Sequence, residues 1–193
     1  MAVKIFKVKH DFTSYSLLPE KNNTFFNLKI GKGESLSEQW NPDWRFYVRN
    51  VIDRDKGSFY YISPSILTFD KILLKGGLEV VLRNHGEFLE SILEDTESEI
   101  IIYNPLKMYD CLDFDNTTFE TDEVGGDITN IAVDIHAFDL EKIGDSSIFK
   151  LPGRYVHPTY VVTGLHDEEK DFYLQYKKLD LTGLDFELVW SNE

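Results

Sequence analysis

Two aspartates separated by one residue are the clearest candidates for chemistry in this sequence of 193 residues. They are Asp113 and Asp115, in the segment 113–117 (Asp-Phe-Asp-Asn-Thr). Two neighbouring carboxylates can hold a divalent ion, but the Asp-x-Asp-x-Asp-Gly loop of a calcium site is not completed here. The alternative is a loop whose carboxylates face solvent.

The segment 113–117 resembles the Asp-x-Asp-x-Thr motif of the haloacid-dehalogenase phosphohydrolases. The resemblance implies that one aspartate attacks phosphorus while the other moves a proton, with Mg²⁺ between the carboxylates and the phosphate. That family places the motif after the first strand of a doubly wound sheet, with a downstream lysine and a later acidic pair. Here the motif lies past the middle of the chain. The following residues 126–131 contain one aspartate, Asp127, and lack the second aspartate of the acidic pair. A Mg-dependent phosphohydrolase using Asp113 and Asp115 is therefore a less favoured alternative.

The remaining reactive residue types show no catalytic spacing. None of the five histidines is paired at i, i+3 or i, i+4, as a helical metal site requires. Cys111 is the single cysteine and, unless a histidine meets it in space, is expected to be a buried packing residue. The glycine fingerprints of phosphate-binding and dinucleotide-binding loops and the Gly-x-Ser-x-Gly elbow are absent. We therefore expect a protein that is not an enzyme and needs no metal or cofactor.

Charge is distributed very unevenly along the chain, whose net charge is -14. Residues 1–86 have a net charge of +4, residues 87–145 of -15, and residues 146–193 of -3. A concentrated negative field opposes nucleic-acid binding, which needs lysine and arginine, and would instead steer a basic protein partner. A solvated acidic surface without a partner is the alternative. The partner-binding residues that this hypothesis names are Asp110, Asp113, Asp115, Glu120, Asp122, Glu123 and Asp127.

Strand patterns dominate the chain, and helical patterns are few and short. Alternating or β-branched and aromatic runs predict strands at 3–8, 25–30, 45–49, 59–62 and 128–140. They also favour a hairpin of 88–94 with 99–103, with a helical turn over 88–95 as the alternative. A short helix is expected over 78–84, while 66–74 is ambiguous between strand and helix. The regular strand–helix alternation of a parallel α/β fold is missing, so we predict an α+β fold dominated by antiparallel sheet.

The C-terminal quarter has the pattern of a strand–helix–strand unit. Leu165, Phe172, Tyr176 and Leu179 are spaced to share one face of a helix over 166–179. Acidic residues in its first turn and lysines in its last suit the helix dipole. After it, Leu184, Phe186, Leu188 and Trp190 are expected on one side of a strand.

Composition indicates one domain, residues 1–193, comprising a mixed-charge strand-rich part (1–86), an acidic part (87–145) and the closing unit (146–193). The sequence is 42% hydrophobic, which is ample for a core. No run approaches the roughly 18 apolar residues of a membrane span, and the first ten residues lack the apolar region of a signal peptide. With a single cysteine, the expected location is the cytoplasm.

The second half of the chain resembles the bacterial polymorphic-toxin immunity family eleven, formerly a domain of unknown function. The segments that carry the resemblance are 101–104 leading to 110–113, Asp145-x-x-Ile148-Phe149-Lys150-Leu151, the strand 160–163, the amphipathic helix, and Leu181-Thr182-Gly183-Leu184-x-Phe186-x-Leu188-Val189-Trp190. The resemblance implies a small cytosolic antidote that binds the toxin domain encoded beside it and blocks it stoichiometrically. A general protein-interaction module without a toxin partner is the alternative, and gene neighbours would separate the two.

Overall fold

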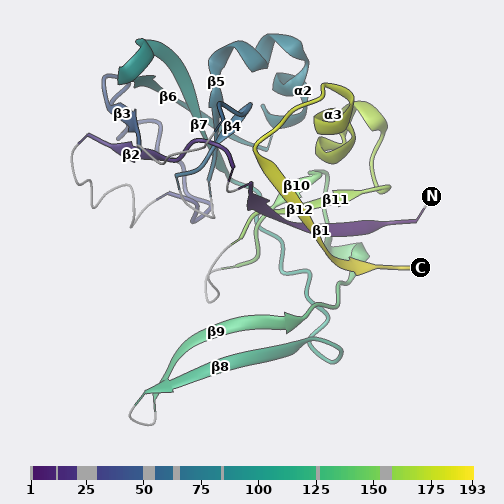
Figure 1. The fold of residues 1–193 in the computed structure, drawn as a ribbon. Helices are drawn as coiled ribbons and strands as arrows, with labels where there is room; N and C mark the ends of the chain where they lie inside the picture. The colour runs from purple at the N-terminus through teal and green to yellow at the C-terminus, as the bar shows by residue number, and fades with distance from the viewer. Residues whose placement is uncertain are drawn as a thin grey trace.

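The protein contains a four-stranded sheet, a six-stranded sheet and a projecting two-stranded hairpin (Figure 1). The computed structural model describes residues 2–11, 13–20, 30–49, 55–62, 66–83, 85–124, 127–152 and 158–193, without the side chains at 76 and 121–131. The strand orders are β10-β11-β1-β12 in the first sheet, β2-β3-β6-β7-β5-β4 in the second, and β8-β9 in the hairpin. Among the named strands only β3 and β6 pair in parallel, which confirms the predicted α+β fold with mainly antiparallel sheet.

The elements are short. The first sheet contains β10 (Ile148–Phe149), β11 (Tyr160–Thr163), β1 (Lys4–His10) and β12 (Leu184–Ser191), and the second contains β2 (Leu17–Pro19), β3 (Arg45–Val48), β6 (Gly86–Leu93), β7 (Ser98–Pro105), β5 (Leu67–Asp70) and β4 (Phe59–Tyr60). The hairpin is β8 (Thr118–Val124) with β9 (Asp127–Ile135). The helices are α2 (Leu78–Leu82) and α3 (Phe172–Lys178), and the 3-10 turns are η1 (Lys71–Gly76), η2 (Glu94–Thr96), η3 (Leu140–Lys142) and η4 (Glu168–Lys170).

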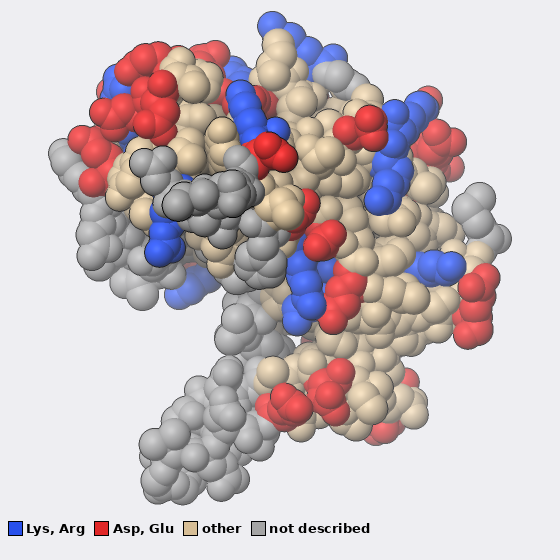
Figure 2. All heavy atoms as spheres, viewed as in Figure 1, with Lys and Arg blue, Asp and Glu red and all other residues tan. Residues whose placement is uncertain are grey.

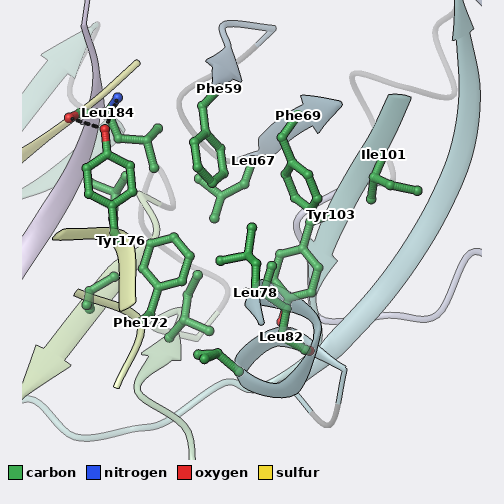
Figure 3. Packing of buried hydrophobic residues seen from close by; sticks show 14 residues of the cluster. Phe59, Leu67, Phe69, Leu78, Leu82, Ile101, Tyr103, Phe172, Tyr176 and Leu184 are labelled. Atoms are coloured by element: carbon green, nitrogen blue, oxygen red, sulfur yellow. Dashed lines mark hydrogen bonds between the residues drawn. The ribbon is translucent and has the colours of Figure 1, made fainter. Parts of the chain in front are cut away.

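One aromatic-rich core joins the two sheets (Figure 3). Phe172 of α3 lies 6.3 Å from Phe59 of β4, ring centre to ring centre, and both side chains are fully buried. The Tyr176 hydroxyl donates to the carbonyl of Leu184 at 3.2 Å and accepts from its N–H at 3.1 Å. Since a buried hydroxyl is costly unless it is hydrogen-bonded, this pair of bonds fixes α3 against the start of β12.

Local patterns predicted several elements well. The opening strand is β1, and the predicted hairpin is β6 with β7, joined by η2. The ambiguous segment 66–74 divides into β5 and η1. The strand predicted over 25–30 lies outside the described residues except for its last residue.

The helix predicted over 166–179 is wrong in length. It is interrupted at Asp171, which ends the turn η4 and caps α3. The buried Asp171 carboxylate accepts hydrogen bonds from the Leu174 N–H at 3.1 Å, the Thr163 hydroxyl at 2.7 Å and the Gly164 N–H at 3.2 Å. These bonds favour a break because the carboxylate satisfies an orphan N–H of the first helical turn. Leu165, predicted on the buried face, is 38% exposed.

The prediction that Trp190 shares a face with Leu188 is also wrong. Ile5 of β1 lies opposite Trp190, whereas its neighbour Phe6 lies opposite Leu188, so Val189 is the extra residue of a β-bulge. A one-residue bulge reverses the alternation beyond it. Trp190 therefore packs beside Phe138 on the outer face of the first sheet, and Leu188 is 53% exposed.

The strand predicted over 128–140 ends at Ile135, and the next residue, His136, turns inward. Its Nε2 lies 3.0 Å from the Tyr160 hydroxyl, and its ring stacks on Phe138. Burial lowers the pKa of His136 to about 4, with a smaller contribution from Lys7. This imidazole stays neutral in the folded protein where the unfolded chain would already be protonated.

His136 is therefore expected to make stability acid-sensitive. Its folded pKa lies below the unfolded value, so the unfolded state binds more protons and stability falls as pH drops from about 6.5 towards 4. In urea denaturation, His136→Gln should reduce this loss by about 1–3 kcal/mol, because glutamine offers Tyr160 a partner without titrating. If the free energy of unfolding depended equally on pH in the wild type and in His136→Gln, the role assigned to His136 would be contradicted.

Candidate protein-binding surface

The predicted acidic site belongs to a lobe of the structure, here called the acidic lobe (residues 110–142). It holds ten acidic residues and one basic residue, Lys142. Its buried residues pack on the outer face of the first sheet, where Cys111, Leu112 and Phe138 join the cluster around Ile5 and Tyr160. The first sheet therefore separates the acidic lobe from the core shared with the second sheet.

Two backbone segments at the base of the hairpin hold the 113–117 loop in place. The Asp113 N–H donates to the Ala137 carbonyl at 2.9 Å, and the Asp139 N–H donates to the Cys111 carbonyl at 2.8 Å. The segments also meet through the bridge between Leu112 and Phe138. Cys111 and Leu112 are buried, Asp113 is half-buried, and residues 114–116 follow as an exposed turn.

Asp113 organises that turn. One carboxylate oxygen accepts from the Asp115 N–H at 3.1 Å, and the other accepts from the Asn116 side-chain amide at 2.7 Å. The bond from Asn116 is the main reason that the pKa of Asp113 lies below its usual value. The carboxylate is thus ionised at neutral pH and engaged by its own loop.

A hollow lies between the turn and the segment 138–142. Its lining residues are Leu112, Asp113, Phe114, Asp115, Phe138, Asp139, Leu140 and Lys142. Leu112 and Phe138 lie beneath it but are buried and expose almost no surface, so the accessible lining is mainly polar, and the rim carries three carboxylates. Lys142 is paired with Asp139 at 3.2 Å, so the rim keeps a net negative charge.

Phe114 is the exposed aromatic residue of this surface. Its side chain is 54% exposed, and its ring stacks on Phe119 with centres 6.0 Å apart. Phe119 in turn packs against the buried cluster around Cys111. An exposed phenylalanine supported by the core and flanked by two aspartates has the composition of an interface anchor.

The seven predicted partner-binding residues are spread along the acidic lobe. Asp113 and Asp115 meet at the hollow, Asp110 is exposed just before it, and Glu120 is exposed on β8. Asp122, Glu123 and Asp127 lie on the strands towards the end of the hairpin, and their side chains are outside the description. On the face drawn in Figure 2, the described surface over the hairpin base carries carboxylates without Lys or Arg.

The cysteine and the described histidines are buried or half-buried in the fold. Cys111 is fully buried, and burial raises the pKa of its thiol to about 12, which opposes a nucleophilic role. His10, His85 and His136 are buried, His166 is half-buried, and His157 lies outside the described residues. Within the described ranges, no three His, Cys, Asp or Glu side chains converge as a metal site would require.

The paired tryptophans of the segment 40–44 hold a loop on the second sheet. Their rings meet at 4.7 Å, and the Trp40 indole N–H donates to the Glu90 carbonyl at 2.7 Å. Trp40 also packs against the buried cluster around Phe46. Both contacts agree with the structural role that tryptophan usually has beside a proline turn.

The sequence gave no indication of the roles of two polar residues, the buried Lys150 and the half-buried Glu87. Lys150 is fully buried, and burial lowers the pKa of its ammonium group to about 7. Glu87 accepts from the N–H of Leu36 at 2.7 Å and the Asn104 amide at 2.8 Å, which ties the loop around residue 36 to β6 and β7. Neither residue has a neighbour in sequence that would mark it, so only the tertiary structure assigns their roles.

No protein-family model matches the chain, and no curated protein sequence matches it significantly. In the described residues, the helices are all too short and insufficiently apolar to cross a bilayer.

Proposed function

We propose that this protein is a cytosolic immunity protein that binds and neutralises a cognate bacterial toxin domain with a basic surface. Inhibition is stoichiometric and proceeds by protein–protein contact. The sequence patterns that resemble immunity family eleven suggest the role, and the acidic lobe supplies the binding chemistry.

The observation that carries the proposal is the concentration of net negative charge on one structural unit. Ten acidic residues and Lys142 lie in the acidic lobe, which stands on the outer face of the first sheet, away from the shared core (Figure 1). Such a field raises the association rate with a basic partner and disfavours wrong partners. Charges that are not needed for the core are free to serve a binding surface.

The engagement of Asp113 supports a binding role over phosphoryl transfer. Both of its carboxylate oxygens accept hydrogen bonds within the loop, and the loop follows no strand of a parallel sheet among the described elements. An attacking carboxylate needs a free oxygen directed at the substrate.

Co-expression with the toxin domain encoded by the adjacent gene tests the proposal. The protein should restore growth of cells that express the toxin domain and should copurify with it as a 1:1 complex. The control is co-expression with an unrelated toxin domain of similar charge, which should stay toxic. Failure to rescue growth, with both proteins expressed and folded, would contradict the proposed function.

A further inference from the structure

We infer that the hollow beside Phe114 receives a lysine or arginine side chain from the basic surface of the toxin domain. This inference rests on the proposed function and assigns the central contact of the complex. The site lies between the turn 113–116 and the segment 138–142.

The exposed ring of Phe114, at the edge of the hollow, is the apolar surface that fits the stem of a long cationic side chain. Leu112 and Phe138 are buried beneath the hollow and expose almost no surface, whereas more than half of the Phe114 side chain is exposed. Lysine and arginine lay their methylene groups on apolar surfaces while their charged ends stay at a polar rim. Phe114 additionally offers an aromatic face to the cation.

The rim selects a positive charge. Asp113, Asp115 and Asp139 line the hollow together with Lys142, which gives three carboxylates to one ammonium group. Lys142 is already paired with Asp139. An incoming cation therefore pairs first with Asp115, while the charge of Asp113, whose oxygens already accept hydrogen bonds within the loop, adds attraction; an acidic side chain would meet net repulsion.

The turn is organised before any partner arrives. The bonds from Asp115 and Asn116 to the Asp113 carboxylate fix the loop that carries Phe114, and Phe119 supports the ring from below. Pre-organised aromatic anchors cost little entropy on binding and are enriched among residues with large effects on affinity. A protein side chain fits this site better than a metal ion, since the described acidic residues form no group of three ligands.

The test compares the affinities of wild type, Phe114→Ala and Leu188→Ala for the toxin domain. Phe114 and Leu188 have almost the same exposure, 54% and 53%, but Leu188 lies on β12 outside the acidic lobe. Phe114→Ala should weaken the complex about 30-fold or more, and Leu188→Ala should change it less than about threefold. Thermal unfolding of both variants checks that each is folded.

Combining Phe114→Ala with single alanine replacements of the toxin's surface lysines and arginines identifies the toxin side chain that enters the hollow. For one of these toxin residues, replacement by alanine should weaken binding to the wild-type protein but have little further effect on binding to Phe114→Ala, because the two side chains share one contact. Wild-type binding by folded Phe114→Ala, or strict additivity with every toxin variant, would overturn the inference and leave the immunity role standing. If the wild-type protein itself does not bind the toxin domain, the proposed function and this inference both fail.

Discussion

Replacing Asp110, Asp115 and Glu120 together with lysine is expected to weaken binding to the toxin domain about 100-fold or more. These side chains are exposed, and none accepts a hydrogen bond from another described residue, so the fold should tolerate the change. The variant replaces three attractive charges by three repulsive ones in a field that steers association, and the association rate should fall most. The affinity of the variant should also depend less steeply on ionic strength, as surface plasmon resonance between about 50 and 300 mM salt would show.

The matched control reverses three exposed acidic residues elsewhere, Glu38, Asp43 and Glu169. It changes net charge by the same amount but leaves the acidic lobe intact, so its affinity should fall less than about fivefold. If both variants lost affinity equally, only total charge would matter. If the acidic-lobe variant bound normally with an unchanged salt slope, the interface would lie elsewhere.

The largest expected effect on stability follows replacement of Phe172 by alanine. Phe172 is fully buried where α3 meets both sheets, and its ring lies near those of Phe59 and Tyr176 (Figure 3). The ring of Phe186 is also close, with centres 6.4 Å apart. Removing it should lower the free energy of unfolding by about 3–5 kcal/mol, through lost burial and the cavity left behind. Urea denaturation monitored by tryptophan fluorescence measures the change.

Leu165→Ala is the control for this prediction. Periodicity alone would place Leu165 and Phe172 on one buried helical face, but Leu165 is 38% exposed. The structure therefore predicts a loss of about 1 kcal/mol or less for Leu165→Ala. Similar losses in the two variants would mean that the helix extends as the simple periodicity suggests.

Local signals predicted the fold class because strands and turns are encoded by alternation and by the residues that interrupt it. They failed where a tertiary contact decides the local geometry. Asp171 ends a helical run because its carboxylate is held by hydrogen bonds from Thr163, the last residue of β11, and from Gly164, which follows that strand. The bulge at Val189 depends on pairing with β1, which lies more than 180 residues earlier in the chain.

The same distinction applies to the candidate site. Sequence showed where acidic residues concentrate, since charge can be counted along the chain. It did not show that Phe138 and Lys142 lie beside Asp113, because that contact requires the hairpin β8–β9 to bring residue 138 back to residue 112. The exposed position of Phe114 was also hidden, as aromatic residues are more often buried than presented to a partner.

Fully buried Lys150 shows a third limit of sequence reasoning. A lysine beside Phe149 and Leu151 looks like the polar position of an alternating strand. In the structure all three side chains are buried, because the segment 107–109 pairs with Lys150 and the cluster around Cys111 covers Phe149. Burial of this kind depends on tertiary contacts, which local sequence patterns do not show.

Titration of the toxin's own activity with purified protein tests the central claim most directly. Toxin activity should fall in proportion to added protein and be abolished at one equivalent. The variant with lysine at positions 110, 115 and 120 should be needed in large excess for the same inhibition. Full toxin activity in the presence of a tenfold excess of folded wild-type protein would contradict the claim.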